Sequence, residues 1–258
     1  MEKTKTLSLR LYVALCYLIT VFVPIFIPGI VLAYVFKLLR FRTFSNRIIN
    51  FLAISWISIF LFLTGRKLEF FPNGLNLDGK KRFMICNHTN GIEAAIFVSV
   101  PYFAKSPNAM LTYLGSDILY RLWVIPIIIY SEVVEAVTFH YHKPNFRDFK
   151  PKVMKALKDR SIILFPEGSR SYSEEIRPFM TGVLKLAYKF GVDLDIFAVS
   201  GLMGYSSAKQ FTQMRKSKKI YMKYAGFIQA KDYPTFQEYL EAAQEKMTTT
   251  KKELDQLY

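Results

Sequence analysis

A histidine and a carboxylate lie five residues apart in the segment NHTNGIE (87–93), at His88 and Glu93. A neutral imidazole can take a proton from a hydroxyl group, and a nearby carboxylate can fix the ring tautomer and stabilise the imidazolium. The spacing is weak support alone, because Asn90 and Glu93 also match a capping box, in which Glu93 bonds back to the Asn90 amide. The residues leave both roles open, and one does not exclude the other.

A second polar segment, FPEGSRS (165–171), follows the apolar run SIIL (161–164). Its candidate binding residues are Glu167, Gly168, Ser169 and Arg170. One interpretation is a surface ion pair on a tight turn. The other is a polar binding site at the end of a buried strand. The position of the segment within the fold decides between them.

Strand-length apolar runs alternate with amphipathic helical stretches from residue 66 onwards. Predicted strands cover 81–86, 134–142, 161–165, 193–199 and 218–227, and predicted helices cover 90–100, 146–159, 181–191 and 235–247. This alternation predicts an α/β domain with a mixed, mostly parallel sheet flanked by helices. Ligands of such sheets bind outside the carboxyl ends of the strands, where both polar segments fall. The position of both polar segments at strand ends therefore favours a binding site over a surface ion pair.

Two uncharged runs, 11–36 and 48–65, precede this domain and flank the basic segment 37–47. They predict a membrane-associating two-helix element at residues 1–65, followed by a catalytic domain at 66–258. A shallow hairpin in one leaflet keeps all basic segments at the cytoplasmic face, in agreement with the positive-inside rule. Two full spans and a buried soluble hairpin are the alternatives. We expect the protein at a membrane, with its catalytic domain on the cytoplasmic face.

Charge and composition limit the partners. Lys and Arg number 35 against 20 Asp and Glu, which gives a net charge of +15, and 52% of residues are hydrophobic. Basic proteins seek polyanions, and the high apolar content favours a lipid bilayer over nucleic acid. The basic stretch 196–231 is either a solvated face or a membrane-surface patch. Two cysteines give no disulfide framework or metal-ligand spacing.

The two motifs together resemble those of the glycerophospholipid acyltransferase family, whose best-known members are 1-acylglycerol-3-phosphate acyltransferases. That family carries NH-x4-D and FPEGTR, matched here by NHTNGIE and FPEGSR, and the resemblance covers residues 66–205. It implies acyl transfer from acyl-CoA or acyl-carrier protein to the hydroxyl of a lysophospholipid, without cofactor or metal. His88 would be the general base and Glu93 would orient it. Residues 167–170 would bind substrate, with Arg170 on a phosphate or acidic head group.

Three blocks depart from the family pattern. The central block VTFHYHKPNFR (137–147) lacks an arginine in register, so His142, Lys143 or Arg147 would substitute. The family's Phe-Lys-x-Gly is FMTG here, with Met180 in place of lysine, and the last apolar block lacks its proline. An aminolipid or another lysolipid therefore stays open as acceptor, and so does a non-catalytic membrane-binding relative. No G-x-S-x-G elbow supports a serine hydrolase.

Overall fold

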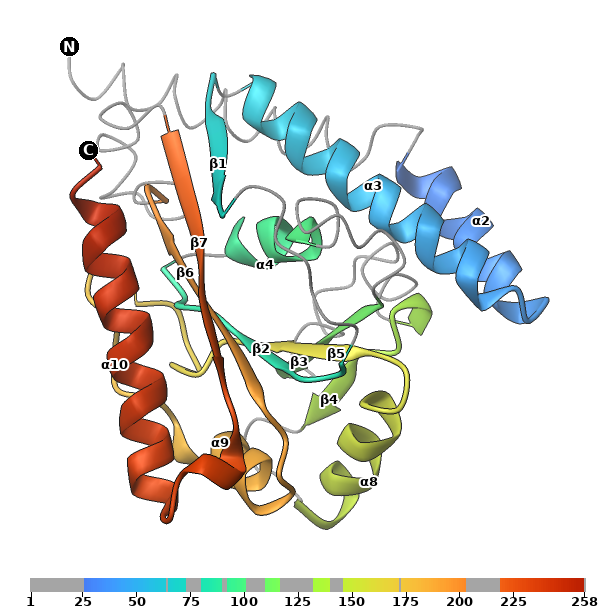
Figure 1. Cartoon of the computed structure of the whole chain (residues 1–258). Helices are drawn as coiled ribbons and strands as arrows, with labels where there is room; N and C mark the ends of the chain where they lie inside the picture. The colour runs from blue at the N-terminus through green and yellow to red at the C-terminus, as the bar shows by residue number, and fades with distance from the viewer. Residues whose placement is uncertain are drawn as a thin grey trace.

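The computed structural model shows one mixed sheet between helices, with a helical hairpin at its N-terminal side (Figure 1). It describes residues 26–63, 65–72, 80–89, 92–100, 110–116, 132–139, 146–171, 173–202 and 219–257. Its helices are α2 (Phe26–Leu38), α3 (Arg42–Leu63), α4 (Ile92–Val98), α8 (Phe146–Ala156), α9 (Thr181–Lys189) and α10 (Phe236–Asp255), with a 3-10 turn at Ala230–Asp232. Its strands are β1 (Lys67–Phe71), β2 (Phe83–Ile85), β3 (Leu111–Ser116), β4 (Val137–Phe139), β5 (Ser161–Leu164), β6 (Leu194–Ser200) and β7 (Lys219–Ile228). The predicted α/β class, with a mixed and mostly parallel sheet flanked by helices, is confirmed, whereas the membrane association of the two helices before it stays a prediction.

The strand order among the described residues is β1-β7-β6-β2-β5-β3-β4. All pairs are parallel except β6 and β7, which run antiparallel. The central strand β2 therefore lies between β5 and β6, parallel to both. Because parallel strands end at the same edge of a sheet, the residues that follow β2, β5 and β6 meet there.

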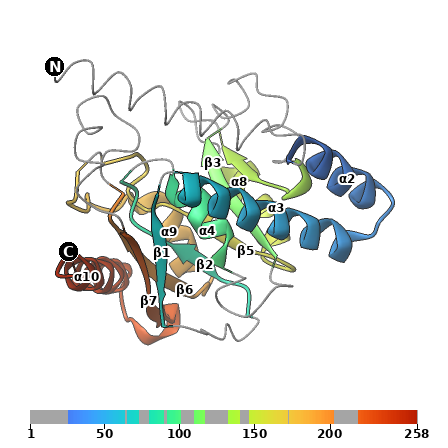
Figure 2. The same ribbon diagram turned by 90° about the horizontal axis from the view of Figure 1, so that it is seen from above.

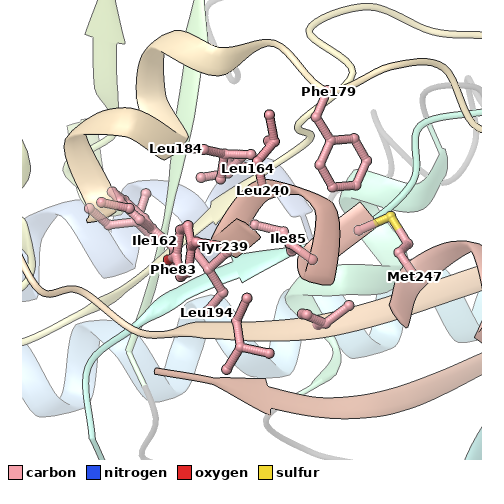
Figure 3. Close-up of a cluster of buried hydrophobic side chains, with 14 of the residues drawn as sticks. Phe83, Ile85, Ile162, Leu164, Phe179, Leu184, Leu194, Tyr239, Leu240 and Met247 are labelled. Carbon is pink, nitrogen blue, oxygen red and sulfur yellow. The ribbon is translucent and has the colours of Figure 1, made fainter. Parts of the chain in front are cut away.

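The strands of the sheet centre are buried on both faces, which explains why they are continuous apolar runs. Along β2, Phe83 and Ile85 pack into the cluster formed with α8, α9 and α10, whereas Met84 faces the cluster formed with α3 and α4. The same alternation holds along β5 and β6. Figure 3 shows the first cluster, in which Tyr239 and Met247 of α10 lie among the strand side chains. The result is a three-layer α/β/α core.

Helix α10 starts within one residue of the predicted start at residue 235 and continues beyond the predicted end at residue 247. The Thr235 hydroxyl accepts a hydrogen bond from the Glu238 amide at 3.3 Å. The helix runs to Asp255 because its apolar and buried face continues past the predicted end, through Leu254. Lys251 lies on that face, 3% exposed, and binds Asp255 at 2.6 Å and Glu174 at 2.7 Å. Packing thus overrides the low helix propensity of the Thr248–Thr250 run.

Helices α2 and α3 form the N-terminal hairpin, on the side of the molecule opposite α10 (Figure 2). Gly29 allows their close approach, because a Cβ atom there would lie 2.7 Å from Leu52. The basic segment 37–47 is not a loop, since α3 already begins at Arg42. Arg42 and Lys37 each lie 3.6 Å from the Glu135 carboxylate of the main domain. These ion pairs hold the hairpin tip against the domain.

The hairpin carries many exposed apolar side chains, including Phe41, Phe44, Phe51 and Phe62. Among the described helices, none combines the length and the apolar character needed to cross a bilayer. The greater part of the first uncharged run, up to residue 25, lies outside the described residues.

Candidate active site

His88 lies two positions beyond Cys86, at the carboxyl end of the central strand β2. The neighbouring residue Asn87 fixes this position by bonding β6. Its side-chain nitrogen donates to the Val199 carbonyl at 3.0 Å, and its oxygen accepts from the Val199 amide at 2.8 Å. A side-chain amide can satisfy both backbone groups of one residue in this way. The segment that carries His88 is therefore tied to the sheet edge.

The structure brings His88 and Glu93 together, as the spacing predicts. His88 Nδ1 lies 3.7 Å from Glu93 Oε2, which is an ion-pair distance rather than a short hydrogen bond. The Glu93 side chain is 1% exposed and the His88 side chain 16%. Glu93 lies in the first turn of α4, while the capping partner Asn90 is outside the described residues. A buried carboxylate beside a partly exposed imidazole is the arrangement of an oriented base.

Phe165, the first residue of the FPEGSRS segment, stacks on the His88 ring and sets its plane. The two rings stack with centroids 4.2 Å apart and planes 18° apart. Because Phe165 directly follows β5, the stack joins the ends of two adjacent parallel strands. The imidazole is thus held by Glu93 at one nitrogen and by Phe165 on one face.

The FPEGSRS turn also binds the His88 backbone on both sides. The Glu167 carboxylate accepts a hydrogen bond from the His88 amide at 2.6 Å, and the Ser171 amide donates to the His88 carbonyl at 2.7 Å. The second Glu167 oxygen accepts from the Arg177 amide at 2.9 Å. Glu167 therefore joins three segments of the site. Its predicted contact with substrate stays a prediction.

Gly168, Ser169 and Arg170 form the exposed part of this turn. Gly168 has φ +69°, and a Cβ atom there would lie 1.9 Å from the Met180 sulfur. Glycine is therefore required by the backbone and by the side chain that lies over the turn. Arg170 extends from an exposed position on the turn that holds His88. Their predicted contacts with substrate are not tested by this geometry.

Two site residues could not be predicted from the motifs: Asn87 as a clamp and Arg177 as a second cation. The Arg177 guanidinium donates to the Ser169 hydroxyl at 3.0 Å and to the Ser171 carbonyl at 3.5 Å. Asn87 could have been noticed because it is a polar residue directly after a buried strand. Nothing in the sequence marked Arg177. Of the predicted substitutes for the central arginine, His142 and Lys143 lie outside the described residues, and Arg147 is the second residue of α8.

The buried carboxylates affect the chemistry of their neighbours. Burial raises the pKa of the Cys86 thiol well above its usual range, and the charges of Glu93 and Glu167 raise it further. Cys86 therefore stays a thiol, which is a poor nucleophile. Burial also raises the pKa of Glu167, against the opposing effect of the Arg177 and His88 amides.

Replacing Glu167 with glutamine is expected to destabilise the protein. Glutamine replaces one carboxyl oxygen by an NH2 group that cannot accept a hydrogen bond, whereas both oxygens of the carboxyl group can accept in the charged form and, with the O–H turned away, in the neutral form. One backbone amide therefore loses its acceptor, at a cost of about 1–3 kcal/mol. Because the native pKa of Glu167 is raised, the native state holds the proton more tightly than the unfolded chain. Its contribution to the free energy of unfolding therefore falls as pH rises above the ordinary value of 4.5.

Urea unfolding across this pH range measures both effects. The stability difference between wild type and Glu167→Gln should be larger at pH 4 than at pH 7, and the exposed Glu175→Gln should show neither effect. Equal stabilities, or a difference that grows with pH, would contradict this account of Glu167.

The fold and site define an α/β enzyme with a histidine–carboxylate pair at the carboxyl edge of its sheet. Residues 64–200 match the model of the Acyltransferase family, just over half of the chain, and the protein belongs to that family. A curated relative, the probable 1-acyl-sn-glycerol-3-phosphate acyltransferase of Mycoplasma pneumoniae, is 25% identical over 162 residues. That match covers 61% of this chain and 58% of the relative, so it spans somewhat more than half of the relative's length.

A solved structure shares the whole architecture. The 1-acyl-sn-glycerophosphate (LPA) acyltransferase PlsC from Thermotoga maritima aligns with a TM-score of 0.74, covering 99% of this chain and 98% of that chain. Sequence identity is 16%, so the likeness shows a common fold.

Proposed function

We propose that the protein transfers a fatty acyl group from acyl-CoA or acyl-carrier protein to the free hydroxyl of a lysophospholipid such as 1-acylglycerol-3-phosphate. The reaction would serve phospholipid biosynthesis or remodelling. The observation that carries the proposal is the His88–Glu93 pair, whose histidine backbone is bonded on both sides by the FPEGSRS turn. Family membership and the name of the Mycoplasma relative support the substrate class.

His88 is the base of the proposed reaction. Its Nδ1 is buried toward Glu93, which leaves Nε2 to take the proton of the acceptor hydroxyl. The hydroxyl oxygen attacks the thioester carbonyl carbon, a C–O bond forms, and the tetrahedral intermediate collapses with cleavage of the C–S bond. The leaving thiolate recovers the proton from His88. Glu93 stabilises the imidazolium between these two steps.

The attack is direct, without an acyl-enzyme. Cys86 is the nearest thiol along the chain, and it is fully buried with a raised pKa. Backbone amides of the two motif turns are the candidates to stabilise the oxyanion. Arg170 presents a planar guanidinium at the exposed turn, a group suited to an acceptor phosphate. No step requires a metal or an organic cofactor.

An acceptor panel tests the proposal. The purified full chain is incubated with an acyl thioester and with lysophosphatidate, other lysophospholipids, an aminolipid or monoacylglycerol, and the products are identified by mass spectrometry. Acyl-CoA and acyl-carrier protein are compared as donors. Diacyl product from lysophosphatidate supports the proposal. Product from the aminolipid alone would move the activity to a different acceptor, and no product from any pair would indicate a non-catalytic relative.

The helical hairpin is the proposed membrane contact. Phe44, Phe51 and Phe62 recur at spacings of seven and eleven residues, so they share one face of α3, and all three are exposed. A row of exposed aromatic side chains is typical of a helix that lies in the membrane interface. The positive net charge adds attraction to anionic lipids. The exposed row supports the proposal of a shallow hairpin. The placement of the catalytic domain on the cytoplasmic face rests on the positive-inside rule alone.

Removing two of these side chains should weaken binding to anionic vesicles. Burying a phenylalanine contributes about 1.5–3 kcal/mol, so the double variant Phe51→Ser, Phe62→Ser should bind at least roughly tenfold more weakly. Co-sedimentation with vesicles measures the effect, and Met154→Ser, an exposed apolar change on α8, is the matched control. High salt should weaken wild-type binding as well. Equal binding of wild type and double variant would count against the hairpin as the contact.

A further inference from the structure

Arg177 places a second guanidinium on the turn that carries Arg170. Its two terminal nitrogens reach the Ser169 hydroxyl at 3.0 Å and the Ser171 carbonyl at 3.5 Å, the residues on either side of Arg170. Both partners are neutral oxygens. A guanidinium has five N–H groups, so further donors remain for an anion.

The backbone holds Arg177 in a fixed place. Its amide donates to Glu167 at 2.9 Å, and Pro178 limits its backbone to extended conformations. Phe179 is buried in the core, and the Met180 amide donates to the Pro166 carbonyl at 2.7 Å. This exposed cation is therefore anchored from both sides, which lowers the entropy cost of binding a ligand.

Carboxylates nearby do not neutralise it. Glu167 bonds the Arg177 amide rather than its guanidinium, and Glu174 is turned to Lys251 at 2.7 Å. Within the described part of the chain, Arg177 forms no ion pair with a carboxylate. Arg170 and Arg177 thus place two cations at one turn, and among the described residues the guanidinium of Arg177 bonds only neutral oxygens. Together they form a site for an anion.

We propose that Arg177 binds the phosphate of the lysophospholipid acceptor together with Arg170. This inference rests on the proposed function. The turn is bonded to the His88 backbone, so an anion bound there lies close to the base. In 1-acylglycerol-3-phosphate the phosphate is on the carbon next to the reacting hydroxyl. In an acyl thioester the phosphates lie at the far end of the pantetheine arm, so the acceptor fits this location and the donor does not.

Met180 provides a built-in test of this assignment. Its side chain lies over the same turn, against Gly168, and is 61% exposed. A lysine at position 180 would place an ammonium group where it can replace the lost cation of an Arg177 variant. Rescue by a cation at a second position would not occur if Arg177 only held the turn together through its bonds to Ser169 and Ser171.

The experiment measures KM for acceptor and donor separately in wild type, Arg177→Gln, Arg177→Gln with Met180→Lys, and the control Lys185→Gln on the exposed face of α9. We expect Arg177→Gln to raise the acceptor KM by about tenfold, because a charge-assisted contact is lost. The donor KM, and the rate with the uncharged acceptor monoacylglycerol, should not change. The added lysine should recover most of the loss, and Lys185→Gln should behave as wild type.

An unchanged acceptor KM, a rise in the donor KM, or an equal loss with monoacylglycerol would overturn the inference. Calorimetric titration with a short-chain, soluble 1-acylglycerol-3-phosphate separates it from the proposed function. A wild type without turnover would remove the proposed function, whereas weaker binding by Arg177→Gln would still support the phosphate site. Equal binding by the two proteins would remove the phosphate site even in an active enzyme.

Discussion

Replacing His88 with alanine is expected to lower kcat for acyl transfer by about a thousandfold, within the range of general-base catalysis. In the proposed mechanism the imidazole removes the acceptor proton, and its Nδ1 is already directed at Glu93. A steady-state assay with lysophosphatidate and an acyl thioester measures the loss. The KM values should change much less than kcat, because substrate binding depends on other groups.

Folding of the His88→Ala variant is checked by its thermal midpoint and circular dichroism. The main-chain bonds from Glu167 and Ser171 to residue 88 do not involve the imidazole, so the turn should stay in place. The stack on Phe165 is lost, and a small drop in the midpoint is expected. A folded variant with wild-type turnover would remove His88 from the mechanism.

Replacing Glu93 with glutamine is expected to lower kcat by about a hundredfold. Glutamine keeps the shape and the capacity to bond a helix-start amide, but it loses the charge that, in the proposed mechanism, stabilises the imidazolium. The variant therefore separates the catalytic role of Glu93 from the capping role that the sequence leaves open. Comparison of kcat with thermal stability measures the two roles independently.

Glu93→Asp is the matched variant, because it keeps the charge and shortens the side chain. It should retain more activity than Glu93→Gln if the carboxylate acts on His88. Full activity of Glu93→Gln, combined with a loss of stability in Glu93→Asp, would reduce Glu93 to a structural residue at the start of α4.

The central strands could be predicted because their burial on two faces produces continuous apolar runs. β1 and β3 were missed, for different reasons. β1 is an edge strand with charged Lys67 and Glu69, and it pairs only with β7 among the described strands. β3 contains a glycine and polar side chains, and it is ordered by its pairing with β5. Such strands are fixed by tertiary neighbours rather than by their own composition.

The candidate site also contains features that the sequence predicts and features that only the folded chain reveals. The proximity of His88, Glu93 and the FPEGSRS turn could be predicted from short motifs, because the proposed chemistry requires these residue types. The bond from Glu167 to the His88 amide could not, since any residue supplies a backbone amide and the two positions are 79 residues apart. Arg177 was missed because its contacts are to Ser169 and Ser171, which it reaches only after the loop folds back.

Acyl transfer through this site is tested most directly by the stoichiometry of the two products. The purified full chain is supplied with an acyl-CoA carrying a labelled acyl group and with 1-acylglycerol-3-phosphate, and released thiol and labelled phosphatidate are quantified in the same reaction. We predict one labelled phosphatidate for each thiol released. Thiol release without labelled phosphatidate would show a hydrolase, and the absence of both products would contradict the assignment of this site to acyl transfer.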